Sequence, residues 1–135
     1  MSVIEFIYVF KKVGLPIIVT SNKPHLFFLI DTGATHNGRF SFVAKALNLS
    51  SDLQVEAINI SGIEGYEKKT PGLTFTLYLD DKEILSEFYI LDANEAIRKI
   101  QEETSIQIHG IFGVPYLDEY SCIVDFNEQL LKFKI

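Results

Sequence analysis

Short runs of β-branched and aromatic residues, each ended by Gly, Pro, Asn or Asp, fill most of the chain and constrain its fold more than any other feature. Such residues are enriched in strands, and the residues between the runs are typical of turns. In residues 73–79, leucine and phenylalanine alternate with threonine and tyrosine, the pattern of a strand with one buried face. We therefore predict a mainly β domain. The expected strands are residues 3–10, 15–20, 25–30, 53–60, 73–79, 84–91, 106–111, 122–125 and 130–135.

Two turn sequences predict antiparallel hairpins. Residues 80–82, Asp-Asp-Lys, lie between the expected strands 73–79 and 84–91. Residues 125–128, Asp-Phe-Asn-Glu, likewise separate the last two expected strands. Asp and Asn favour turns, so each sequence predicts a tight connection between neighbouring strands.

Three segments favour short helices between the strands. Residues 42–49 place apolar side chains near one face after Ser41, whose hydroxyl can cap a helix start. Residues 94–103 have apolar groups at helical spacing among charged ones. Pro115 suits a first helical position because its φ is fixed and it lacks an N–H, so a short helix is expected from there to Tyr120.

The strongest chemical signal is Asp31, which follows the apolar run Phe27-Phe28-Leu29-Ile30. A buried carboxylate without a partner is costly, so an Asp at the end of a buried strand is usually paired, hydrogen-bonded or functional. Thr32 and Gly33 complete an Asp-Thr-Gly tripeptide. An Asp that only caps the following turn explains this tripeptide equally well.

A second segment, Ile111-Phe112-Gly113, favours a functional role for the Asp-Thr-Gly tripeptide over a turn alone. Two apolar residues and a glycine that end a buried strand before a short helix resemble the hydrophobic-hydrophobic-Gly motif of aspartic proteases. Together with Asp-Thr-Gly about eighty residues upstream, it makes the chain resemble the retropepsin-like (retroviral-type) aspartic proteases, of the small bacterial single-domain type, over nearly its whole length. The resemblance continues through residues 116–126 and 130–135.

The resemblance implies a retropepsin-like acid-protease fold, a closed β-barrel-like domain with two or three short helices that spans residues 1–135. It also implies an aspartic endopeptidase, in which two carboxylates share a proton. Because the chain has one Asp-Thr-Gly, the pair would be Asp31 and Asp31 of a second subunit, in a homodimer. Thr32 would bridge to the partner's loop, and Gly33 would let the backbone approach the pair.

The same resemblance assigns the peptide-binding residues. They are Ala34, Gly62, Ile63, Glu64, Gly65, Ile111, Phe112 and Gly113. Residues 62–65 would form the tip of a flap that closes over a peptide, since glycine accepts the positive φ of tight hairpin turns. An ordinary hairpin turn is the alternative for this segment. The charged helix expected at 94–104 departs from the compact viral enzymes and would reshape the cleft wall or the dimer edge.

Charge and residue usage exclude other classes of protein. Twelve Lys and Arg against eighteen Asp and Glu give a net charge of −6, which disfavours a nucleic-acid partner. Cys122 is the single cysteine and the three histidines are far apart, so neither an internal disulfide nor a sequence-local metal site is expected. The sequence has no nucleotide-binding glycine pattern, so no cofactor is expected. No apolar run is long enough for a membrane helix, and the N-terminal segment resembles a strand rather than a signal peptide, so we expect a cytoplasmic protein.

Other functions remain open beside peptide hydrolysis. A catalytically weak or inactive retropepsin-like module that binds peptides or dimerises is the main alternative, because a fold does not fix a function. A small-ligand-binding β-barrel, in which Asp31 is only a turn residue, leaves Ile111-Phe112-Gly113 unexplained. His36 is close to Asp31 in sequence, and a solvated loop histidine is its simpler interpretation. Cys122 could pair with His109 as a nucleophile, but its apolar neighbours favour an inert buried thiol.

Overall fold

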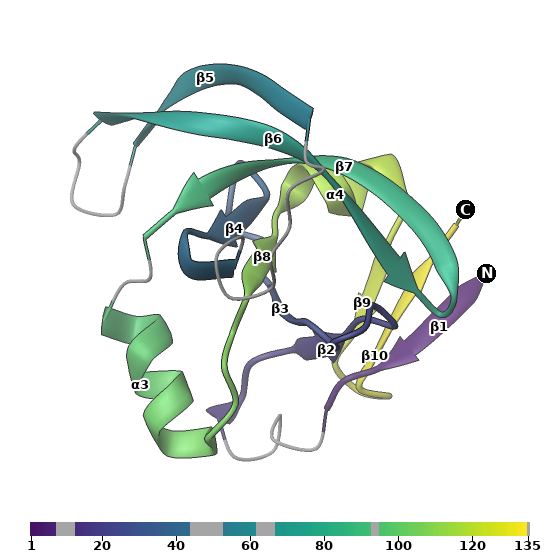
Figure 1. Ribbon diagram of the computed structural model, residues 1–135. Coiled ribbons are helices and arrows are strands. Elements are labelled where there is room, and N and C mark those ends of the chain that lie inside the picture. Colours follow the sequence, from purple (N-terminus) through teal and green to yellow (C-terminus); the bar gives the residue numbers. More distant parts are fainter. Residues whose placement is uncertain (8–12, 44–52, 62–66, 93–94, 135) are drawn as a thin grey trace.

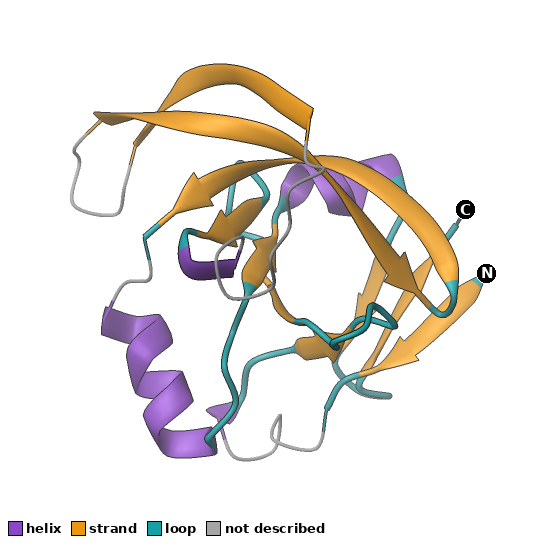
Figure 2. Cartoon of the chain, viewed as in Figure 1, coloured by secondary structure: helices purple, strands orange, loops and turns teal. Residues whose placement is uncertain are grey.

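The structure is a computed structural model that describes residues 1–7, 13–43, 53–61, 67–92 and 95–134 (Figure 1). Strands dominate it, as the sequence predicts (Figure 2). The strands are β1 (Ser2–Glu5), β2 (Ile17–Val19), β3 (Phe27–Ile30), β4 (Gly38–Phe40), β5 (Leu53–Ser61), β6 (Glu67–Leu79), β7 (Lys82–Leu91), β8 (Gly110–Phe112), β9 (Ile123–Asp125) and β10 (Leu130–Phe133). The helices are α3 (Glu95–Thr104) and α4 (Val114–Glu119), which confirms two of the expected helices.

The strands form two sheets. One has seven strands in the order β2-β3-β8-β4-β7-β6-β5, and the other has three in the order β1-β10-β9. The fold class is therefore mainly β, but in the described residues the sheets do not close into the expected barrel, because β2 and β5 remain at opposite edges of the larger sheet. The β5–β6 hairpin extends beyond the rest of that sheet (Figure 1).

Both predicted hairpins are confirmed. Leu79 pairs with Lys82, so Asp80 and Asp81 form a two-residue turn between β6 and β7. Their φ angles are 51° and 59°, and Asp tolerates this left-handed region better than most residues. The second hairpin joins β9 to β10, which run antiparallel.

Three elements differ from the expectation or fall partly outside the description. Strand β4 has no period-2 pattern and was not predicted, yet all three of its residues are buried. Strand β8 covers only the end of the expected strand 106–111, extended by Phe112. Of the expected helix 42–49, residues 44–49 lie outside the described residues.

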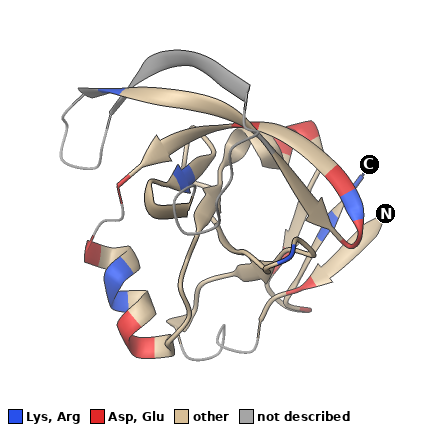
Figure 3. Cartoon of the chain, in the orientation of Figure 1, with Lys and Arg blue, Asp and Glu red and all other residues tan. Residues whose placement is uncertain are grey.

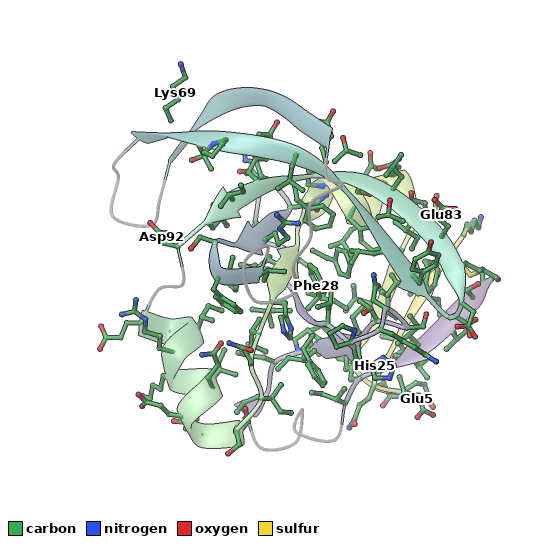
Figure 4. All side chains as sticks on the ribbon, in the orientation of Figure 1. Glu5, His25, Phe28, Lys69, Glu83 and Asp92 are labelled. Carbon is green, nitrogen blue, oxygen red and sulfur yellow. The ribbon has the colours of Figure 1, made fainter. Side chains whose placement is uncertain are left out.

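The core lies mainly between the sheets and α4. Phe28, Phe112 and Tyr116 form a stack, with ring centroids 4.6 Å apart for the first pair and 4.1 Å for the second. Phe28 lies in the interior of the molecule (Figure 4). A second cluster packs Ile97 and Ile100 of α3 against residues of β2, β3 and β4. Side chains of β3 and β8 belong to both clusters, so close packing fixes the ends of these two strands in place.

Candidate active site

The two sequence motifs meet because β3 and β8 are parallel neighbours. Ile30 pairs with Phe112, so the strands end at the same edge of the sheet. The Asp31 N–H donates a hydrogen bond to the Phe112 carbonyl at 2.9 Å. The Asp-Thr-Gly turn and the hydrophobic-hydrophobic-Gly segment, about eighty residues apart in sequence, are therefore in direct contact.

Asp31 organises the turn that follows it. Its Oδ1 accepts a hydrogen bond from the Gly33 N–H at 3.0 Å, and its carbonyl accepts one from the Ala34 N–H at 3.1 Å. The capping role considered for this Asp is thus present. Among the described residues no donor reaches the other carboxylate oxygen, and Asp31 is partly exposed. The turn therefore orients the carboxylate and leaves one oxygen available for chemistry.

Gly113 is required where the two segments cross. A Cβ at this position would lie 2.5 Å from the His36 carbonyl oxygen and 2.8 Å from that of Ala34. The Ala34 carbonyl also accepts a hydrogen bond from the Val114 N–H at 2.9 Å. Since backbone atoms cannot move aside cheaply, the close approach of this loop to the start of α4 depends on a residue without a side chain.

Asn37 is the residue of this site that the sequence did not reveal. It is 3% exposed, and its Oδ1 accepts hydrogen bonds from the N–H groups of Gly113 at 3.0 Å and Tyr116 at 3.3 Å. Its Nδ2 donates to the Glu87 carbonyl at 3.2 Å, and its own carbonyl accepts from the Tyr89 N–H at 2.9 Å. One buried amide thus joins the Asp31 loop to β7, to Gly113 and to α4. The sequence carries no signal for it beyond an Asn next to a glycine, which suggests only a turn.

The other predicted site residues have different surroundings. Thr32 and Gly33 are exposed, whereas Ala34 and Ile111 are half-buried. Phe112 is fully buried in the aromatic stack, so in this chain its side chain supports the loop instead of facing a ligand. Gly62, Ile63, Glu64 and Gly65 lie outside the described residues. They connect β5 to β6, whose last described pair is Ser61 with Glu67, and their role as a flap tip stays a prediction.

His36 is not fully solvated, which differs from the expectation. It is half-buried, and its ring packs edge-on against Tyr89 with centroids 5.4 Å apart. Its Nδ1 lies 3.0 Å from the Thr35 hydroxyl. The Cys122 thiol is half-buried, and burial raises its pKa to about 11. This supports the interpretation of Cys122 as an inert thiol, because the reactive form is the thiolate.

His109 is buried against the strand that carries Asp31. Its Nδ1 accepts a hydrogen bond from the Phe27 N–H at 3.0 Å, so the ring is neutral with its proton on Nε2. Burial lowers the pKa of His109 below 6.5. A proton on Nδ1 would break the bond to Phe27, so protonation opposes folding.

This arrangement predicts an acid-sensitive fold. As the pH falls, His109 is protonated in the unfolded chain before it is protonated in the folded chain. The contribution of neutral His109 to stability is therefore complete above pH ~6.5 and is lost as the pH falls through the pKa of His109 in the folded chain. We expect the free energy of unfolding of the wild type to decline more steeply below pH ~6.5 than that of His109→Gln, by up to about 1.4 kcal/mol per pH unit. Urea denaturation at several pH values measures both slopes, and parallel slopes would contradict the assignment.

Comparisons with known proteins agree with the two motifs. No protein-family model matches the sequence. The chain is 28% identical over 106 residues to the retrovirus-related Pol polyprotein from transposon 412 of Drosophila melanogaster. The match covers 77% of this chain and 8% of the polyprotein, so the chain spans only a small part of that relative's length.

Three solved structures share the architecture. The retroviral protease-like domain of Ddi1 from Leishmania major superposes with a TM-score of 0.59 at 12% identity, covering 87% of each chain. A retropepsin-like aspartic protease from Rickettsia conorii superposes with a TM-score of 0.56 at 15% identity, covering 96% of this chain and 86% of that one. EIAV protease, in complex with the inhibitor HBY-793, superposes with a TM-score of 0.54 at 19% identity. The match covers 78% of this chain and 86% of that one. The chain therefore has the retropepsin-like fold, as its motifs predicted.

Proposed function

We propose that this chain is an aspartic endopeptidase that acts as a homodimer, with Asp31 of each subunit forming the catalytic pair. The observation that carries the proposal is the position of Asp31, at the end of a buried strand, bonded to the hydrophobic-hydrophobic-Gly segment within a retropepsin-like fold. The single Asp-Thr-Gly per chain supports a pair built from two copies. The region that forms the catalytic unit is residues 1–135.

The proposed chemistry needs no cofactor. One Asp31 carboxylate takes a proton from a water molecule, whose oxygen attacks the carbonyl carbon of the peptide bond. The proton on the other Asp31 goes to the carbonyl oxygen. When the tetrahedral intermediate collapses, the C–N bond breaks, and the leaving amine takes the proton that the first Asp31 accepted from water. A hydroxyl proton of the intermediate returns to the second Asp31, which restores the pair. Both carboxylates must be close and share one proton, which a single copy of the chain does not provide.

The neighbours of Asp31 have supporting roles in this proposal. Thr32, exposed at the tip of the turn, would contact the partner's loop, and Gly33 would leave room beside the pair. Ala34, Ile111 and residues 62–65 would contact the peptide. Phe112 and Gly113 would position the Asp31 loop. The Phe112 carbonyl accepts the hydrogen bond from the Asp31 N–H, and Gly113 allows the close packing of the loop against the start of α4.

The main alternative is a module that binds peptides or dimerises without turnover. The intact Asp31-Thr32-Gly33 tripeptide supports catalysis, since a module without turnover would not need it. In the described residues no helix is long and apolar enough to cross a membrane. We propose a cytoplasmic location, because the one cysteine leaves the chain without an internal disulfide.

Mixing experiments test the two-subunit site. We expect activity per chain to fall on dilution, because dimers dissociate, and an excess of Asp31→Asn chains to suppress wild-type activity by forming inactive heterodimers. With nine variant chains per wild-type chain, random pairing leaves about one tenth of the wild-type chains in active dimers. Peptide cleavage after equilibration measures this fraction. Activity that scales linearly with dilution and is unaffected by the variant would indicate a site within one chain.

A further inference from the structure

Among the described residues, no strand pairs with the outer edge of β7 before Tyr89, and we call this stretch its free edge. Leu79 and Lys82 flank the two-residue turn and form a hydrogen-bonded pair, so hydrogen-bonded and non-bonded pairs alternate from there along the β6–β7 ladder. By this alternation the N–H and C=O groups of Leu85 and Glu87 point away from β6. Strand β4 covers that edge of β7 only from Tyr89 onward.

Among the described residues, the carbonyl groups of Leu85 and Glu87 on this edge have hydrogen-bond partners and their N–H groups do not. The Glu87 carbonyl accepts from Asn37 Nδ2 at 3.2 Å, and the Leu85 carbonyl accepts from the Tyr120 hydroxyl at 3.4 Å. Within the described part of the chain, no acceptor reaches the N–H of Leu85 or of Glu87. These two donors are about 7 Å apart, the spacing of alternate residues in a strand. An extended peptide presents carbonyl groups at the same spacing.

A groove of about 450 Å³ lies at this free edge. Leu85 and Glu87 line it from β7, and Pro115 and Glu119 line it from α4. Both glutamates are exposed, and no lysine or arginine is among the described residues that line the groove. Leu85 is 53% exposed and gives the groove an apolar surface on β7. Acidic residues of β7 and α4 are visible on this side of the molecule in Figure 3.

We propose that this groove, which we call the β7 groove, binds an extended peptide segment that carries basic side chains. The segment adds as a strand to the free edge of β7, and its carbonyls accept hydrogen bonds from the N–H groups of Leu85 and Glu87. Its apolar side chains pack on Leu85 and Pro115. Its lysine or arginine side chains pair with Glu87 and Glu119, whose charges no lining residue compensates.

The β7 groove is a different site from the Asp31 turn, yet the two share one residue. Asn37 lines the groove and bonds the Glu87 carbonyl through Nδ2, while its Oδ1 holds Gly113 and Tyr116. A peptide in the groove would therefore contact the side chain that fixes the Asp31 loop. The proposal concerns binding alone and does not depend on proteolytic activity.

Binding of designed peptides tests the proposal on the full chain. The probe is a fluorescein-labelled octapeptide of alternating Val and Lys, which favours strands and is basic. Its two controls are the alternating Val-Glu peptide, which reverses the charge, and the alternating Pro-Lys peptide, which keeps the charge but cannot add as a strand. Fluorescence anisotropy should show that the Val-Lys peptide binds at least about tenfold more tightly than either control.

Amide hydrogen exchange, followed by NMR, locates the bound peptide. The N–H groups of Leu85 and Glu87 should exchange at least about tenfold more slowly when the Val-Lys peptide is bound. The N–H groups of Ile84 and Phe88, already in the β6–β7 ladder, should change little. Protection or shift changes at Gly33 and Ala34 instead would place the peptide at the Asp31 turn and overturn the proposal.

Charge variants complete the test. The double variant Glu87→Gln with Glu119→Gln should weaken Val-Lys binding by about tenfold, because two opposing charges are lost. The matched control, Glu95→Gln with Glu102→Gln, removes the same charge from exposed positions on α3 and should leave binding unchanged. An equal loss of Val-Lys affinity in both double variants would show that only net charge acts. Equal binding of the Val-Lys and Val-Glu peptides would show that the charge of the peptide does not matter, and either result would contradict the proposed binding site.

Discussion

The Asp31→Asn variant is expected to hydrolyse peptides at least about a thousandfold more slowly than the wild type, because it removes both carboxylates of the proposed pair. Its stability should change little. The asparagine carbonyl oxygen can still accept the hydrogen bond from the Gly33 N–H that shapes the turn. Cleavage of a random peptide library between pH 3 and pH 8, together with thermal unfolding of both proteins, measures the two effects separately.

A second aspartate provides the matched control for this substitution. Asp125 also caps a turn, through a hydrogen bond from the Glu128 N–H to its Oδ1 at 2.9 Å. Asp125→Asn makes the same chemical change in a turn outside the proposed site, so activity should be retained. Full activity in Asp31→Asn would exclude the carboxylate mechanism. Equal loss in both variants would indicate a defect in folding and not in chemistry.

Replacement of Asn37 should have the largest effect on stability. Leucine in its place would leave the buried N–H groups of Gly113 and Tyr116 without their partner and would remove the donor to the part-buried Glu87 carbonyl. Each unsatisfied buried group costs about 1–3 kcal/mol, so we expect Asn37→Leu to lower the free energy of unfolding by roughly 3–6 kcal/mol. Urea denaturation followed by circular dichroism measures the change.

Two further variants separate the causes. Asn37→Asp keeps the acceptor for Gly113 and Tyr116 but loses the donor to Glu87, so it should recover part of the stability. Asn127 is exposed and bonds only to the adjacent Glu128 among the described residues, so Asn127→Leu should change stability by less than about 0.5 kcal/mol. Similar losses at both asparagines would mean that the contacts of Asn37 are not what stabilises the Asp31 loop.

Local patterns in the sequence predicted local structure well. The β6–β7 hairpin follows from alternation in residues 73–79 and from two aspartates that accept positive φ, and both signals act over a few residues. Strand β4 was missed because Gly38-Arg39-Phe40 is buried throughout and therefore does not alternate. The start of β8 was predicted four residues too early because Ile106 and Ile108 continue the apolar pattern of the strand that follows them.

The candidate site depends on contacts that local patterns do not encode. The pairing of β3 with β8 joins residues about eighty positions apart, which no local pattern in the sequence predicts. Asn37 makes its contacts with β7, with α4 and with Gly113 just before α4, and each partner is a backbone group that almost any residue type would supply. Such a residue becomes recognisable only after the chain has folded around it.

The pairing of β1 with β10 has a consequence for synthesis of the protein. Ser2 pairs with Phe133, and the two chain ends lie side by side (Figure 1). On the ribosome, β10 is made only after all the strands of the larger sheet, so β1 must stay unpaired while those strands are translated. An unpaired strand is a template for association with other chains. The nascent chain is therefore open to association through β1 until β10 has been made, which is the interval in which a chaperone would protect it.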